Sequence, residues 1–148
     1  MNKDTHIAVI YGGISTEREV SLRSGAAVHK ALLDAGFTHV DLFDLKKDNL
    51  SELKALSPDV AFLALHGEGG EDGSIQGALE LLGIPYTGSG VASSAMCMDK
   101  IITKHMLAVT GIPTAPYAVI RRGEYTSSVD AAKAAVAAVG LPMVVKWI

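Results

Sequence analysis

The strongest constraint on the fold is an alternation of short apolar runs with stretches of helical periodicity. His6 to Tyr11 is a six-residue run that stops at two glycines, and apolar residues then recur at helical spacing from Thr16 to Leu33. A second run spans Val60 to Leu65. Short apolar runs of this kind are typical of parallel strands buried on both faces. The alternation therefore predicts an α/β fold, an open parallel sheet flanked by helices.

The ends of the first helix and the remaining elements are predicted from local signals. Thr16 and Glu19 have the spacing of a capping box, and Gly36 follows the last periodic residue as a helix-ending glycine. Further strands are expected at 39–43, 86–87, 117–120 and 143–146, and further helices at 50–56, 75–82, from 91 onward, 99–109 and 130–139.

The character of the sequence changes near Asp99. A helix is followed there by a Thr-Gly-Ile-Pro segment, a second proline and an alanine-rich helix. A chain of 148 residues has room for one ordinary domain, or for one domain and part of another. We predict one domain over residues 1–98 and the beginning of a second over residues 99–148.

Composition excludes several classes of partner. The net charge is −3, and the chain has four Tyr, three Phe and one Trp, so neither a basic stripe nor an aromatic platform for bases is expected. No apolar run approaches the roughly 18 residues of a membrane span. Cys97 is the only cysteine, which excludes an intrachain disulfide. We expect a cytoplasmic protein that binds neither nucleic acid nor membranes.

The first glycine loop, Gly12 to Leu22, leaves a strand and opens a helix. It matches neither the dinucleotide fingerprint nor the P-loop signature. Glu17 lies at the helix start, where a carboxylate is favoured by the helix dipole. Two interpretations stay open, because Glu17 either balances the charge of the helix end or holds an ammonium group of a substrate.

The second glycine loop, His66 to Gly77, follows the second buried run directly. Its glycines permit close approach of a ligand, but Glu68, Glu71 and Asp72 would repel a phosphate. The loop is therefore a candidate wall of a substrate site. His66 is either a structural residue at a strand end, a substrate contact or, with the acids, a metal ligand.

Two lysines are the remaining candidates. Lys100 follows Asp99, which is placed to cap a new helix, and Lys146 ends the apolar segment that begins at Pro142. Each is either an ordinary exposed lysine or a point charge that reaches a nucleotide phosphate.

The motifs in order resemble those of the D-alanine–D-alanine ligase family, within the ATP-grasp superfamily. The resemblance spans nearly the whole chain and is carried by Gly-Gly-Ile-Ser-Thr-Glu-Arg-Glu-Val-Ser-Leu at 12–22, Leu-His-Gly-Glu-Gly-Gly-Glu-Asp-Gly-Ser-Ile-Gln-Gly at 65–77, Pro-Tyr-Thr-Gly-Ser-Gly at 85–90, Met-Asp-Lys at 98–100 and Gly-Leu-Pro-Met-Val-Val-Lys at 140–146. It implies a Rossmann-like pre-ATP-grasp domain followed by the beginning of an ATP-grasp domain.

The resemblance also implies roles for four residues. Glu17 would anchor the ammonium of the first D-alanine as a catalytic and substrate-binding residue, His66 would lie beside that substrate, and Lys100 and Lys146 would contact phosphates of ATP. In the family, ATP with Mg²⁺ phosphorylates the first D-alanine, and the second attacks the acylphosphate to give the dipeptide for peptidoglycan precursors.

The chain departs from the family pattern at Trp147-Ile148, where family members usually continue with a proline and a serine-containing loop. We expect magnesium ligands to lie outside this chain, so no metal ligand is assigned, and we expect no turnover by the chain alone. A homodimer through the N-terminal domain is expected. We also expect self-association or disorder from about residue 115 onward, because the predicted strand at 143–146 would be left uncovered. Three alternatives stay open: a complete small enzyme of another class, a noncatalytic partner of an intact ligase, and a D-alanine–D-lactate ligase.

Overall fold

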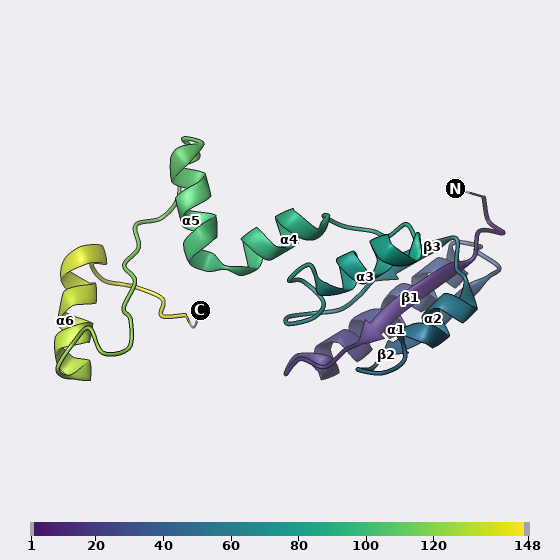
Figure 1. Ribbon diagram of the computed structural model, residues 1–148, viewed down its shortest axis with the longest axis horizontal. Helices are drawn as coiled ribbons and strands as arrows, with labels where there is room; N and C mark the ends of the chain where they lie inside the picture. Colours follow the sequence, from purple (N-terminus) through teal and green to yellow (C-terminus); the bar gives the residue numbers. More distant parts are fainter. Residues whose placement is uncertain (1, 147–148) are drawn as a thin grey trace. The chain divides into compact units, whose positions relative to one another are not determined.

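The computed structural model describes residues 2–146 (Figure 1). The chain divides after Met98 into two compact units. The first contains β1 (Ile7–Gly12), α1 (Arg18–Asp34), β2 (Val40–Leu45), α2 (Leu50–Leu56), β3 (Val60–Leu63), α3 (Ser74–Leu82) and α4 (Val91–Met98). The second contains α5 (Lys100–Val109) and α6 (Ser128–Val139).

The first unit is built on a parallel sheet of three strands in the order β2-β1-β3. Ile7 of the central strand β1 pairs with Val40 of β2 on one side and with Val60 of β3 on the other. Tyr86 makes an isolated parallel bridge to Ala61, which extends the pairing beyond β3. The predicted α/β class with an open parallel sheet is confirmed.

Helices cover both faces of this sheet, because alternate side chains of a strand point to opposite faces. Ile7 and Val9 of β1 belong to a core that includes residues of α1, whereas Ala8 and Ile10 belong to a core that includes residues of α2 and α3. All four are at most 3% exposed. The apolar run that predicted a strand is therefore buried on both sides.

The predicted capping box at the start of α1 is wrong. The helix begins at Arg18, so Glu17 and not Thr16 occupies the N-cap position, and no side chain caps the helix there. Instead the Glu17 N–H donates to the Ser15 hydroxyl over 3.1 Å. The sequence pattern located the helix correctly but placed its N-cap one residue too early.

The second unit contains helices but neither of its predicted strands. Asp99 caps α5, as predicted, by accepting from the Ile101 and Ile102 N–H groups. Residues 117–120 and 143–146 are not strands, which corrects both predictions. A strand is stabilised by hydrogen bonds to a neighbour, and no segment among residues 99–146 pairs with either one. That this unit begins an ATP-grasp domain stays a prediction.

Candidate functional site

The candidate site lies at the switch point of the sheet, where successive strands are added on opposite sides of β1. From β1 the chain passes to β2 on one side, and it later enters β3 on the other side of β1. In open parallel sheets, ligands bind at the carboxyl ends of strands beside such a switch point. The two glycine loops follow β1 and β3, so the fold brings both predicted loops to this edge.

Serine hydroxyls join the two loops directly. Ser21, which is completely buried, donates to the Ala64 carbonyl over 2.7 Å and accepts from the Gly12 N–H over 2.9 Å. Ser15 donates to the His66 carbonyl over 2.7 Å. The end of β1, the start of α1 and the segment after β3 therefore form one hydrogen-bonded unit.

The Glu17 carboxylate lies against the second loop. A Cβ added to Gly67 would come within 2.8 Å of Glu17 Oε2, and the positive φ of +69° also favours glycine at this position. Glu17 is exposed, and within residues 2–146 no side chain or backbone group forms a hydrogen bond or ion pair with its carboxylate. This carboxylate is therefore available to a cationic group of a ligand.

His66 lies beside Gly67, and a side chain of α1 holds its ring. Its Nε2 and the Ser24 hydroxyl of α1 share a hydrogen bond of 3.0 Å. His66 is half-buried, and its carbonyl is held by Ser15. Both its ring and its backbone are thus positioned by side chains from 15–24. The structure brings Glu17 and His66, two of the predicted site residues, to adjoining positions.

The acids of the second loop shape the loop itself. Glu71 accepts from the Gly67 N–H over 2.7 Å, and Asp72 accepts from the Gly69 and Ser74 N–H groups over 2.8 and 3.0 Å. Burial alone would raise the pKa of Asp72, but these hydrogen bonds favour its charged form and bring the pKa below its usual value. The sequence predicted that these acids would repel a phosphate, or bind a metal together with His66, and it missed this internal role.

An ion pair ties the first loop to β2. Arg18 makes a bidentate contact with Asp44, with distances of 2.8 and 2.7 Å, and also donates to the Gly13 carbonyl over 3.1 Å. The hydrogen bond from Arg18 holds the pKa of Asp44 below its usual value. Sequence reasoning missed this pair, because the two residues belong to separate elements and have no characteristic spacing.

A cavity of about 430 Å³ opens beside the loops. His66 and Glu68 line it, whereas Glu17 does not. Most of its walls are apolar residues from the ends of the strands and from the neighbouring helices, namely Ile14, Leu45, Leu50, Leu65, Ile75 and Ala78. Lys46, Lys47 and Ser74 line the cavity as well, so its walls also carry charged and polar side chains.

The two predicted phosphate contacts lie in the second unit. Lys100 is the first residue of α5, and Lys146 follows the unpaired segment that begins at Pro142. Both side chains are exposed. Their role toward ATP stays a prediction.

The described residues do not fit a magnesium site. Among residues 2–146, the only group of three or more His, Cys, Asp or Glu side chains placed to share a metal ion is His6, His39 and Asp41. Two of these are imidazoles, whereas Mg²⁺ prefers an octahedral set of oxygen ligands. No catalytic step is therefore derived through a metal held by these residues.

Sequence comparisons identify relatives of this chain. A family described as "D-ala D-ala ligase N-terminus" matches residues 42–89. D-alanine–D-alanine ligase of Desulforamulus reducens is 52% identical over 142 residues, which cover 95% of this chain and 46% of the relative. The ligase of Moorella thermoacetica is 50% identical, with 95% and 45% covered. The chain thus spans about half the length of these relatives.

Solved structures agree with the sequence comparisons. The Bacillus anthracis D-alanine–D-alanine ligase complexed with ATP matches with a TM-score of 0.70 and 38% identity, over 87% of this chain and 44% of that one. D-alanyl-alanine synthetase A of Vibrio cholerae matches with a TM-score of 0.72 and 30% identity, over 93% and 46%.

The fold, together with these likenesses, relates the chain to a class of ligases. More particularly, the chain belongs to the D-alanine–D-alanine ligase family and corresponds to its N-terminal part. Within residues 2–146, no helix is both long and apolar enough to cross a membrane.

Proposed function

We propose that this chain supplies the subsite for the first D-alanine of a D-alanine–D-alanine ligase. One observation carries the proposal: the exposed Glu17 carboxylate lies without a partner among residues 2–146, against Gly67 and next to His66. A small amino acid at neutral pH presents one ammonium group, and a fixed carboxylate is its natural acceptor. The ligase relatives support D-alanine as this amino acid.

Glu17 binds the ammonium, and His66 orients the carboxylate end of the substrate. The ring of His66 is held by Ser24 over 3.0 Å, and the backbone of the same residue is held by Ser15 over 2.7 Å. Because both its ring and its backbone are held, His66 loses little conformational freedom when the substrate binds, which favours a role in positioning the substrate. In this proposal His66 is a substrate contact and not a metal ligand.

The whole enzyme would join two D-alanines with ATP, by way of an acylphosphate, for peptidoglycan precursors in the cytoplasm. Lys100 and Lys146 would contact the ATP phosphates, where preorganised cations offset charge during phosphoryl transfer. The ATP complex of the Bacillus anthracis relative supports the nucleotide. Bound Mg²⁺ would supply charge neutralisation of the phosphates, and a homodimer through the first unit is part of the same proposal.

D-alanine binding tests the subsite. We expect D-alanine to shift the amide signals of residues 66 and 67 in an NMR titration of the chain. Glu17→Gln removes the charge that the ammonium meets, and losing a hydrogen bond between charged groups costs about 1.5–3 kcal/mol, or roughly a 10- to 150-fold loss of affinity. Glu19→Gln is the matched control, since Glu19 is also exposed and lies in the first turn of the same helix.

Equal weakening by both substitutions would mean that general charge and not the position of Glu17 matters, and the proposal would fail. ATP-dependent phosphate release with D-alanine and Mg²⁺ gives a second readout. We expect no release by this chain alone. Release that disappears in Glu17→Gln would still place Glu17 at the substrate, but would show that the chain assembles a working site.

A further inference from the structure

A cluster of metal-ligating side chains lies at the opposite end of the sheet from the glycine loops. His6 directly precedes β1 and His39 directly precedes β2. Because Ile7 pairs with Val40, the two histidines are neighbours across the parallel pair. Asp41 lies two residues after His39, so its side chain points to the same face of the sheet. The register of the sheet therefore gathers all three side chains.

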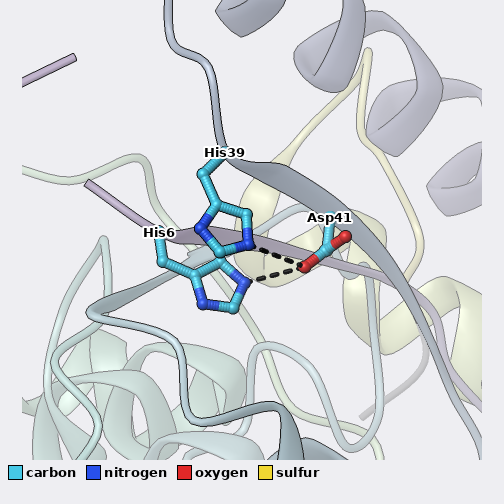
Figure 2. Close-up of side chains that lie close together, drawn as sticks. All are labelled: His6, His39 and Asp41. Carbon is cyan, nitrogen blue, oxygen red and sulfur yellow. Dashed lines mark hydrogen bonds and ion pairs between the residues drawn. The ribbon is translucent and has the colours of Figure 1, made fainter. Parts of the chain in front are cut away.

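The three side chains converge on one carboxylate oxygen (Figure 2). His6 Nε2 lies 2.7 Å from Asp41 Oδ2, and His39 Nε2 lies 3.9 Å from the same atom. The imidazole rings are stacked, with centroids 3.7 Å apart and planes 2° from parallel. Each residue thus presents a ligand atom toward a common point, and these atoms all lie within 4.8 Å of one another.

Hydrogen bonds fix the backbone at His6 and His39. The His6 N–H donates to the Asp59 carboxylate over 2.8 Å, and the His39 carbonyl accepts from the Ile7 N–H over 3.0 Å. The side chains of His6, Asp41 and His39 are 13%, 43% and 58% exposed. His6 is therefore an anchored ligand, whereas Asp41 and His39 have room to adjust.

Two imidazoles and one carboxylate suit a divalent transition metal, since imidazole nitrogen favours Zn²⁺, Cu²⁺ or Ni²⁺ over Mg²⁺ or Ca²⁺. Around tetrahedral Zn²⁺, with bonds of about 2.0–2.2 Å, ligand atoms lie roughly 3.3–3.6 Å apart. The His6–Asp41 separation must widen to reach this value, and the His39–Asp41 separation must shorten. Parallel rings direct their lone pairs side by side, so the exposed His39 ring has to tilt toward the ion.

We propose that His6, His39 and Asp41 form a binding site for a divalent transition-metal ion such as Zn²⁺, with solvent at the fourth position. The ion joins the beginnings of β1 and β2, whereas Glu17 and His66 lie beyond the ends of β1 and β3. Its role is structural: it holds two neighbouring strands together and takes no part in binding D-alanine.

Calorimetric titration of the whole chain with Zn²⁺, after removal of metal with EDTA, tests the site. We expect one saturable ion per chain, with affinity at least about tenfold weaker in His39→Asn, since losing even a supporting partner of a ligand costs this much. Asp41→Asn should weaken binding similarly. His105→Asn is the matched control, because His105 is an exposed histidine of α5 outside the cluster.

NMR of the histidine ring nitrogens locates the ion. Zn²⁺ should shift the ring signals of His6 and His39 but not those of His105. Zn²⁺ should also raise the unfolding temperature of the parent chain and of His105→Asn, but not that of His39→Asn. No binding by the parent chain, or equal binding by His39→Asn, would overturn the proposal. His39→Asn decides the matter even if Asp41→Asn does not fold, because His39 is largely exposed and its side chain is not part of the core.

Discussion

Replacement of Ser21 by alanine should separate the two loops of the candidate site and destabilise the first unit. The Ser21 hydroxyl joins the end of β1 to the segment after β3, through bonds of 2.9 Å to the Gly12 N–H and 2.7 Å to the Ala64 carbonyl. It does so beside the backbone bond of 2.9 Å from the Ala64 N–H to the Ile10 carbonyl. Ser21 is 0% exposed and Ala64 is 6% exposed, so water does not replace the lost hydroxyl.

The expected cost follows from these two bonds. Each net hydrogen bond contributes about 0.5–1.5 kcal/mol, and each backbone group left buried without a partner costs about 1–3 kcal/mol. The two estimates overlap and are not additive, so we expect a loss of about 2–4 kcal/mol in the free energy of unfolding. This is a large share of the roughly 5–15 kcal/mol that holds an ordinary domain together.

Amide hydrogen exchange of residues 7–12 measures this loss within the first unit. A loss of about 2–4 kcal/mol corresponds to exchange roughly 30-fold to nearly 1000-fold faster for amides that open only on global unfolding. Ser51→Ala is the control, because Ser51 is exposed on α2 and its replacement should change stability by no more than about 0.5 kcal/mol. If Ser21→Ala behaves like this control, the hydroxyl does not join the loops and the reasoning is refuted.

Three further predictions concern packing, pH and association. Gly25→Ala should destabilise by about 1–3 kcal/mol in urea unfolding despite better helix propensity, because its Cβ would lie 2.4 Å from Tyr11 Cβ; unchanged stability would contradict this close packing. Asp44→Asn should be less stable than the parent at neutral pH. The lowered pKa of Asp44 means that its contribution is present above 3.8 and is lost as pH falls through the folded value, so the two unfolding curves should converge in acid and a gap independent of pH would refute the assignment. Val145→Glu should reduce concentration-dependent self-association in light scattering, since Val144 and Val145 are 81% and 87% exposed, and a monomeric parent at high concentration would contradict the expectation.

The sequence predicted the first unit well because its signals are local and strong. The run at 7–12 is buried on both faces, so nearly every residue carries the strand signal, and α2 falls on the predicted residues 50–56. The segments at 117–120 and 143–146 carried the same apolar signal and are not strands. Local composition indicates which residues favour a strand, but a strand also needs a neighbour to pair with, and that requirement is not visible in a short window.

The sequence predicted the two loop motifs of the candidate site, but not the hydrogen bonds that hold these loops in place. The placement of Glu17 and His66 follows from two loops at the carboxyl ends of strands. The sequence does not identify the serines that hold these loops, because a serine within a helical pattern gives no indication of a carbonyl partner that is distant in the sequence. The Ser21 contact spans 43 positions and the Ser24 contact spans 42, so each exists only once α1 has packed on the sheet.

The face of α1 that packs on the sheet has two roles, which are divided along the length of the helix. Val28 and Leu32 pack against the core that contains Val9, which fixes the height and angle of the helix on the sheet. Ser21 and Ser24, in its first two turns, use that position to hold the segment from Ala64 to His66. Because the same packing sets both contacts, a change such as Gly25→Ala that displaces α1 should weaken D-alanine binding as well as stability, although Gly25 touches neither Glu17 nor His66.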